Sequence, residues 1–219
     1  TMDGSQSGPM ALLKRLRGSQ KTRAASTGAE QMRMLKRLPK LLRFIPGTAQ
    51  DVRAYFLTLQ YWLAGSQGNI DNMVRLLVER YADGPRKAMR ATAKPQQPIE
   101  YPEVGLYHPR MSHPSAVGLM ATTMDALPKV ATTGTRGTVG LLLMRSYLLA
   151  GNADHYKGVI TALEARGLRV IPAFATGLDQ RPAIAAYFQD AEGRSRIDAM
   201  VSLTGFSLVG GPAYNDAKA

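Results

Sequence analysis

Hydrophobic positions between residues 29 and 83 recur at steps of three and four, which is the spacing of apolar stripes along helices. Over 29–45 this spacing predicts one helix with a basic opposite side. Pro39 falls inside the stripe and should kink or split that helix, because proline removes a backbone hydrogen-bond donor. Residues 29–83 are therefore expected to form a helical segment whose apolar faces pack on one another.

Two further helices are predicted in this segment, over 49–64 and 70–81. Thr48 and Asn69 stand at the positions of their N-caps, and Gly65 stands where the first of them should end. The positions expected to be buried are Val52, Phe56, Leu59 and Leu63 in the first helix, widened by Tyr55 and Trp62, and Ile70, Met73, Val74, Leu77, Val78 and Tyr81 in the second.

Residues 84–137 contain seven prolines, which is too many for long regular elements. This stretch is predicted to be a linker that holds one short extended piece, 104–107, as an edge strand. The pattern then changes to apolar runs of strand length at 138–144, 168–174 and 199–203. Predicted helices separate these runs, one capped by Asn152 and ending at Arg166, and a weaker one over 182–188.

Strands and helices that alternate with short links indicate a right-handed parallel α/β unit. The fold class predicted is α+β overall, a helical segment followed by a partial, flavodoxin-like α/β unit with three parallel strands. The expected organisation is a mobile basic arm (1–28), the helical segment (29–83), the linker (84–137) and the partial α/β domain (138–219). The chain begins Thr1-Met2 and its last residues read as the start of a helix, so we expect an internal piece of a longer protein.

Apolar residues make up 45% of the 219 positions and charged residues 20%, which is enough apolar side chain for a core. The chain contains no cysteine, which excludes disulfides, thiolate zinc sites and a cysteine nucleophile. No apolar run reaches the roughly 20 residues that a membrane-spanning helix needs. The sequence thus predicts a soluble protein without a transmembrane segment.

The formal net charge is +12, and residues 1–50 carry ten Lys and Arg against two Asp and Glu. Such a basic block can bind nucleic acid or another anionic surface. It lacks the interleaved aromatic residues of single-strand binders, which favours a solvated helix face or an acidic partner. A basic nucleic-acid-binding module stays as an alternative of a different class, although nucleic acid is not the expected partner.

Ligands of open parallel sheets bind beyond the carboxyl ends of the strands. Arg145 follows the first predicted strand and could pair with an anion or with a neighbouring carboxylate. Gly210 and Gly211 follow the third, but the segment TGFSLVGGPA lacks the spacing of a phosphate-binding loop. It is interpreted as a closely packed turn.

The three histidines give little support for a metal site or a catalytic group. His155 lies in the first turn of a predicted helix, where a surface or packed histidine is the favoured interpretation over a ligand or proton shuttle. His108 and His113 are five residues apart in a proline-rich loop, without the spacing of a helical zinc pair or a third carboxylate ligand. The residues alone assign no catalytic group and no metal site.

Longer strings of the sequence carry a resemblance to a known family. These strings are LPKLLRFIPGTAQDVRAYFLTLQYWLAGSQGNIDNMVRLLVERYA, YPEVGLYHP, TVGLLLMRSYLLAGNADHYKGVITALEARGLRVIPAFATGLD and VSLTGFSLVGGPA, in that order. Together they resemble the large, porphyrin-binding (H) subunit of magnesium chelatases, in its bacteriochlorophyll-pathway form. The large subunit of cobaltochelatase shares the general layout and is the alternative.

The resemblance implies a fragment of a subunit that binds protoporphyrin IX and works with two ATPase-type partner subunits to insert Mg²⁺. It implies Mg²⁺ and ATP for the whole complex, a bacterial cytoplasmic location, and no cofactor or activity in this fragment alone. Motif positions that it carries over are His108, Arg145, His155, Gly210 and Gly211, which are weak candidates for binding and have no catalytic role assigned.

Overall fold

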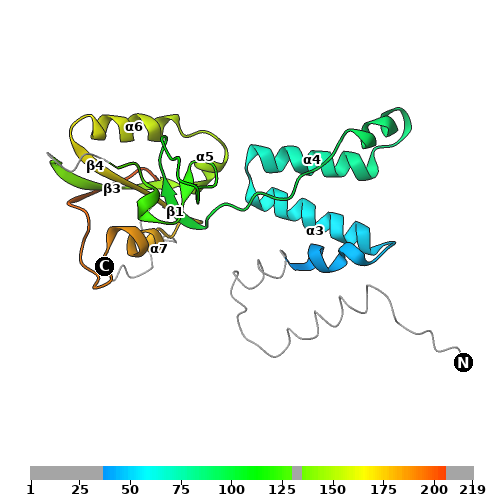
Figure 1. Cartoon of the computed structure of the whole chain (residues 1–219), viewed down its shortest axis with the longest axis horizontal. Helices are drawn as coiled ribbons and strands as arrows, with labels where there is room; N and C mark the ends of the chain where they lie inside the picture. The colour runs from blue at the N-terminus through cyan, green and yellow to red at the C-terminus, as the bar shows by residue number, and fades with distance from the viewer. Residues whose placement is uncertain (1–36, 130–134, 206–219) are drawn as a thin grey trace, which may run out of the picture. The chain divides into compact units, whose positions relative to one another are not determined.

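The helix pair α3 (Ala49–Ala64) and α4 (Gln67–Tyr81) is the centre of the first of two compact units, Thr1–Ile99 and Glu100–Ala219 (Figure 1). The computed structural model describes residues 37–129 and 135–205. The predicted arm 1–28, the beginning of the first predicted helix and the segment with Gly210 and Gly211 lie outside the described residues.

The 3₁₀ turns η2 (Leu42–Phe44) and η3 (Gly84–Ala91) flank the helix pair, and the second of them was not expected from the proline pattern. Gly65 ends α3 as predicted, with a φ of 65° in the left-handed region that glycine adopts readily. Thr48 stands at the N-cap position of α3 as predicted, but its side chain makes no cap bond. The N-cap predicted for the second helix is wrong, because Ser66, not Asn69, precedes α4 and its side chain accepts the backbone N–H of Asn69.

The buried faces of the two helices also differ from the prediction. Leu57, Tyr61 and Leu76 form the small core between the helices. Tyr55 and Trp62, predicted to widen the buried face, are 65% and 63% exposed. Helical spacing identified the elements, but the buried side is set by which side the following chain segment covers, and that is a tertiary property.

That covering segment is the extended stretch 96–99, which two buried asparagines of α4 hold in place. The Asn69 side chain accepts the backbone N–H of Ile99 at 2.8 Å and donates to its carbonyl at 3.0 Å. Asn72 Oδ1 accepts the N–H of Gln96 at 2.7 Å, and the Tyr61 hydroxyl donates to the Gln96 carbonyl. The side-chain amides of Asn69 and Asn72 therefore form hydrogen bonds to the backbone of this segment, as a neighbouring strand would in a sheet.

The second unit contains a five-stranded mixed sheet. Its order is β2 (Met120–Ala121), β1 (Val104–Tyr107), β4 (Leu168–Ala175), β3 (Gly137–Met144) and β5 (Ala199–Ser202). The last three strands are parallel, and β1 is antiparallel to both of its neighbours. The three predicted parallel strands are present. The sheet nevertheless has five strands, because the proline-rich stretch supplies both the predicted strand at 104–107 and the unpredicted β2.

The physical reason lies in how short the added strands are. β2 has two residues, too few to show any alternation, and prolines flank β1 without interrupting it. β1 is also not the edge strand that was expected, since β2 pairs with its outer side. The three longer runs were predicted to within about two residues.

Helices cover both faces of this sheet, α6 (Asp154–Glu164) on one and α7 (Arg181–Ala183) with the π-helical turn η5 (Ile184–Phe188) on the other (Figure 1). Tyr156 and Ile160 of α6 are fully buried against the first face. Ala153, not the predicted Asn152, precedes α6, and it makes no side-chain cap bond.

Close backbone contact is needed on the second face. Gly140 of β3 lies under Phe188, where a Cβ atom would meet the ring at 2.9 Å.

In the described part of the chain, no helix combines the length and the apolar character that crossing a membrane requires.

Candidate functional site

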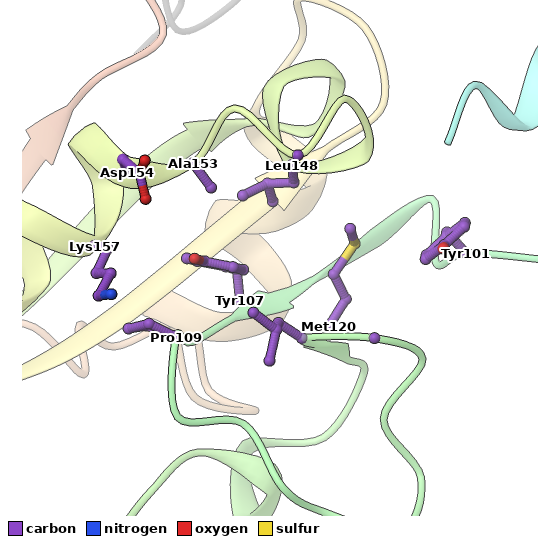
Figure 2. Close-up of a pocket in the computed structure, with 11 residues that line it drawn as sticks. Tyr101, Tyr107, Pro109, Met120, Leu148, Ala153, Asp154 and Lys157 are labelled. Carbon is purple, nitrogen blue, oxygen red and sulfur yellow. The ribbon is translucent and has the colours of Figure 1, made fainter. Parts of the chain in front are cut away.

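An open pocket of about 330 Å³ lies in the second unit, between the β1–β2 region and the connection from β3 to α6 (Figure 2). That connection includes the short helix α5 (Arg145–Leu149). The lining residues are mostly apolar, with two tyrosines and one charge of each sign: Tyr101, Tyr107, Pro109, Gly118, Leu119, Met120, Leu148, Gly151, Ala153, Asp154 and Lys157.

The pocket stands where parallel sheets generally bind ligands. Leu148, Gly151 and Ala153 belong to the connection that leaves the carboxyl end of β3, and this end of a strand is the common binding edge in open α/β sheets. The opposite wall comes from the antiparallel pair β1 and β2, which the sequence pattern did not reveal as a pair.

Aromatic and sulfur side chains form the interior of the pocket. Tyr107 and Met120 are each 4% exposed and belong to the core cluster beneath α6. Burial raises the pKa of the Tyr107 hydroxyl, and the negative charge of Asp154 raises that pKa further. The phenol is therefore neutral near pH 7 and available as a hydrogen-bonding group.

The two charges of the pocket come from the first turns of α6. Figure 2 shows Lys157 and Asp154 on the same side of the hollow and Met120 on the other side, with Tyr107 in the middle of the view. Within residues 37–129 and 135–205, neither Lys157 nor Asp154 forms an ion pair. Lys157 is the cation that this pocket offers to a ligand.

Arg145 ties the two walls of the pocket together. Its Nε donates to the carbonyl of Pro102 at 2.7 Å and its Nη2 donates to that of Tyr101 at 3.2 Å. Burial lowers the pKa of the guanidinium, and the charge of Glu103 opposes that change. Arg145 thus bonds to backbone carbonyls, whereas the sequence suggested an anion or a carboxylate as its partner.

His155 lies on the exposed side of the same region. Its ring contacts Tyr147 edge-on, with centroids 5.5 Å apart, and lies 3.9 Å from the ring of Tyr156. The Tyr156 hydroxyl accepts the N–H of Met144 at 3.0 Å, which fixes the end of β3. His155 is outside the pocket lining, and these contacts are those of a surface histidine packed on tyrosines.

His108 contacts the other end of α6, at Glu164, which lies about 14 Å along the helix from His155 at a rise of 1.5 Å per residue. It is 2% exposed, and its Nδ1 accepts the backbone N–H of Arg110 at 3.1 Å. The ring hydrogen is therefore on Nε2, which donates to Glu164 Oε1 at 3.1 Å. Arg110 closes the cluster by donating to both oxygens of Glu164.

The cluster of His108, Arg110 and Glu164 anchors the loop after β1 to the end of α6. Its three members satisfy one another, so it offers no open coordination position. No group of three or more histidine, aspartate or glutamate side chains suited to a metal ion occurs among the described residues. Gly210 and Gly211 lie beyond these residues.

Sequence reasoning missed the pocket-lining Tyr101, Tyr107, Met120 and Lys157. The string YPEVGLYHP contains both tyrosines, and their presence beside a predicted strand was the available signal. Lys157 carried no such signal, because an isolated lysine on a predicted helix is ordinarily a solvated side chain.

Comparison with known proteins gives two family matches. Residues 59–219 match the family described as CobN/Magnesium Chelatase, and residues 1–56 match a domain of unknown function, DUF3479. The chain is 57% identical over 218 residues to the H subunit of magnesium chelatase from Cereibacter sphaeroides and 52% identical over 214 residues to that from Rhodobacter capsulatus.

These matches cover 100% and 97% of this chain but 17% of each relative, so the chain spans about a sixth of the length of the curated relatives it matches. The chloroplastic magnesium-chelatase protein ChlH of Oryza sativa subsp. indica is 36% identical over 201 residues, which is 84% of this chain and 14% of that protein. A solved structure of the catalytic subunit of cobaltochelatase from Mycobacterium tuberculosis aligns with 68% of this chain and 10% of its own, at 19% identity and a TM-score of 0.41.

Proposed function

The chain belongs to the CobN/magnesium chelatase family, and from this we propose that it is part of the large H subunit of a magnesium chelatase. In this proposal the whole subunit binds protoporphyrin IX. Two ATPase-type partner subunits hydrolyse ATP, and the complex inserts Mg²⁺ into the macrocycle for bacteriochlorophyll or chlorophyll synthesis in the bacterial cytoplasm.

The observation that carries the proposal is the identity of 57% along the entire chain to a protein named as the H subunit of magnesium chelatase. The identity includes the helical unit as well as the sheet unit, since the match covers 100% of the chain. A relationship of that extent supports a shared role more strongly than a shared fold would.

Each component has a distinct part in this proposal. Mg²⁺ is a substrate, and it gives up its bound water reluctantly, which is a physical reason for coupling its insertion to ATP hydrolysis. The ATP sites belong to the partner subunits, and the segment TGFSLVGGPA of this chain lacks the spacing of a phosphate-binding loop. This chain would contribute structure and porphyrin contacts.

The finer organisation is also part of the proposal. The parallel order β4, β3, β5 is compatible with a flavodoxin-like unit that is completed in the whole subunit. The basic arm at 1–28, the helical segment at 29–83 and the α/β domain from 138 onward would be separate working parts, joined by the stretch 84–137.

A reconstituted reaction tests the proposed function. The natural polypeptide that contains this chain is mixed with the two ATPase-type subunits, protoporphyrin IX, Mg²⁺ and ATP, and the fluorescence of magnesium protoporphyrin is followed. We expect metal insertion that depends on ATP and on all three subunits. Insertion of Co²⁺ into a corrin precursor, without magnesium insertion, would overturn the proposal in favour of cobaltochelatase.

A matched control uses the 219-residue chain in place of the natural polypeptide. With the two partner subunits present it should give no metalloporphyrin, and the chain by itself should hydrolyse no ATP, because it represents about a sixth of its relatives' length. Turnover with the chain alone would contradict this assignment of roles.

A further inference from the structure

We propose that the pocket between the β1–β2 region and the β3–α6 connection binds the carboxylate-bearing edge of a planar apolar molecule, with Lys157 holding the carboxylate. This inference rests on the proposed function, in which the planar molecule is the porphyrin and the carboxylate is one of its propionates. It assigns a place of contact to a part of the chain that the family resemblance leaves without a role.

The shape and chemistry of the lining support an aromatic ligand. Tyr107, Met120 and Leu148 present rings, sulfur and aliphatic carbon to the hollow, and Tyr101 stands at its margin (Figure 2). Aromatic rings and thioethers pack well on flat conjugated systems. Leu119 at the edge of the pocket is 41% exposed, so an apolar ligand would also cover surface that now faces water.

The charges select an acidic group at a defined position. Lys157 lines the pocket and has no ion-pair partner in the described parts of the chain. A carboxylate there gains an ion pair and a hydrogen bond. Asp154, one helical turn before Lys157, repels the same carboxylate. The pair therefore makes two opposite predictions, loss of affinity without Lys157 and gain of affinity without Asp154.

The pocket is also built before any ligand arrives. Arg145 joins the β3–α6 connection to the carbonyls of Pro102 and Tyr101, and the Tyr156 hydroxyl fixes the end of β3. Walls that are already ordered lose little conformational entropy on binding, which leaves more of the contact energy for affinity.

The volume limits how much of the ligand can enter. At about 330 Å³ the pocket lies at the small end of the roughly 300–1,000 Å³ typical of ligand sites. A porphyrin would place one edge in it and keep the centre of its ring outside. The metal-binding nitrogens would then remain accessible to the rest of the subunit, as metal insertion requires.

The test measures porphyrin binding by the natural polypeptide that contains this chain. Quenching of protein fluorescence by protoporphyrin IX is compared with quenching by its dimethyl ester, which has the same ring without the carboxylates. The variants are Lys157→Gln, Asp154→Asn and Ala153→Leu, which narrows the pocket. Their controls are Lys87→Gln, an exposed position in the helical unit, and Ala162→Leu, an exposed position of α6 outside the pocket.

We expect Lys157→Gln to weaken binding of the diacid by about three- to fivefold, as a partly exposed ion pair allows, and to leave the ester unaffected. Asp154→Asn should strengthen binding of the diacid, and Ala153→Leu should weaken binding of both molecules. Circular dichroism of each variant checks that the fold is retained.

Two results would overturn the inference. If all three pocket variants bind the diacid as the wild type and the controls do, while ATP-dependent magnesium insertion proceeds, the pocket is not the contact and the proposed function stands. If the wild-type polypeptide binds neither porphyrin, the inference and the proposed function fail together.

Discussion

The imidazole of His108 and the carboxylate of Glu164 meet across 56 residues of sequence, with Nε2 3.1 Å from Oε1. The contact joins the loop after β1 to the last residue of α6. Because the backbone N–H of Arg110 occupies Nδ1, the ring is held as the neutral tautomer that carries its hydrogen on Nε2. A proton added to Nδ1 would displace that backbone donor.

This geometry makes the stability of the sheet unit depend on pH. Burial holds the pKa of His108 below the ordinary 6.5, with the charge of Arg110 acting in the same direction and Glu164 opposing both. Below pH 6.5 the unfolded chain binds a proton that the folded chain does not yet bind. The free energy of unfolding should therefore fall as pH falls from about 6.5 toward the lower pKa of the folded state.

Urea unfolding of the chain at several pH values between about 5 and 8 measures this dependence. His108→Asn should lower the free energy of unfolding at about pH 8 by about 1–3 kcal/mol, since buried partners lose their hydrogen bonds, and should make the curve flatter at acidic pH. The control His113→Asn retains the cluster and with it the slope due to His108. An unchanged slope in His108→Asn would contradict the assignment.

Two glycines of the sheet unit should respond to alanine in opposite directions. At Gly140 a Cβ would lie 2.7 Å from Ile197 Cδ1, so Gly140→Ala should destabilise by about 1–3 kcal/mol through overpacking. Gly158 lies in the middle of α6 with open space around it, so Gly158→Ala should stabilise by about 0.5–1 kcal/mol. The denaturant midpoint of each variant shows whether the substitution stabilises or destabilises the chain. Equal shifts of the two midpoints would contradict the prediction and show that the face of the sheet over β3 is loosely packed.

Asn69 should prove necessary for the order of the segment 96–99. In Asn69→Ala the backbone N–H and carbonyl of Ile99 lose both side-chain partners, which should cost about 1–3 kcal/mol. The amide of Ile99 should then exchange with solvent faster. Asp71→Ala, at an exposed position of the same helix, is the matched control. Unaltered exchange at Ile99 would show that other contacts hold the segment.

The sequence was informative where a pattern is long and local. The apolar runs of β3 and β4 and the spacing in α3 and α4 placed those elements within a few residues. The residues buried in the helix pair could not be predicted from such a local pattern. Asn69 and Asn72 are buried because their amides bond to a segment 30 and 24 residues later, and hydrophobic spacing gives such residues no weight.

The pocket shows the same limit. Its walls come from β1, β2 and the β3–α6 connection, so it forms only when β1 and β2 pair in the antiparallel sense. That pairing could not be predicted, because β2 has only two residues. Arg145 could be singled out as following a strand, yet its partners are main-chain carbonyls, which every residue possesses. No side-chain pattern could have named them.

The strands of the sheet unit are paired over unequal lengths, so the sheet should open from one particular edge. β3 pairs with β4 along eight residues but with β5 along four, and all four residues of β5 are exposed. Thermal fluctuations should therefore unzip the sheet from β5 while β3 and β4 stay joined. Each such opening briefly exposes the main-chain donors and acceptors of β3. A strand of another chain that paired with them at that moment would hold the sheet open and start aggregation.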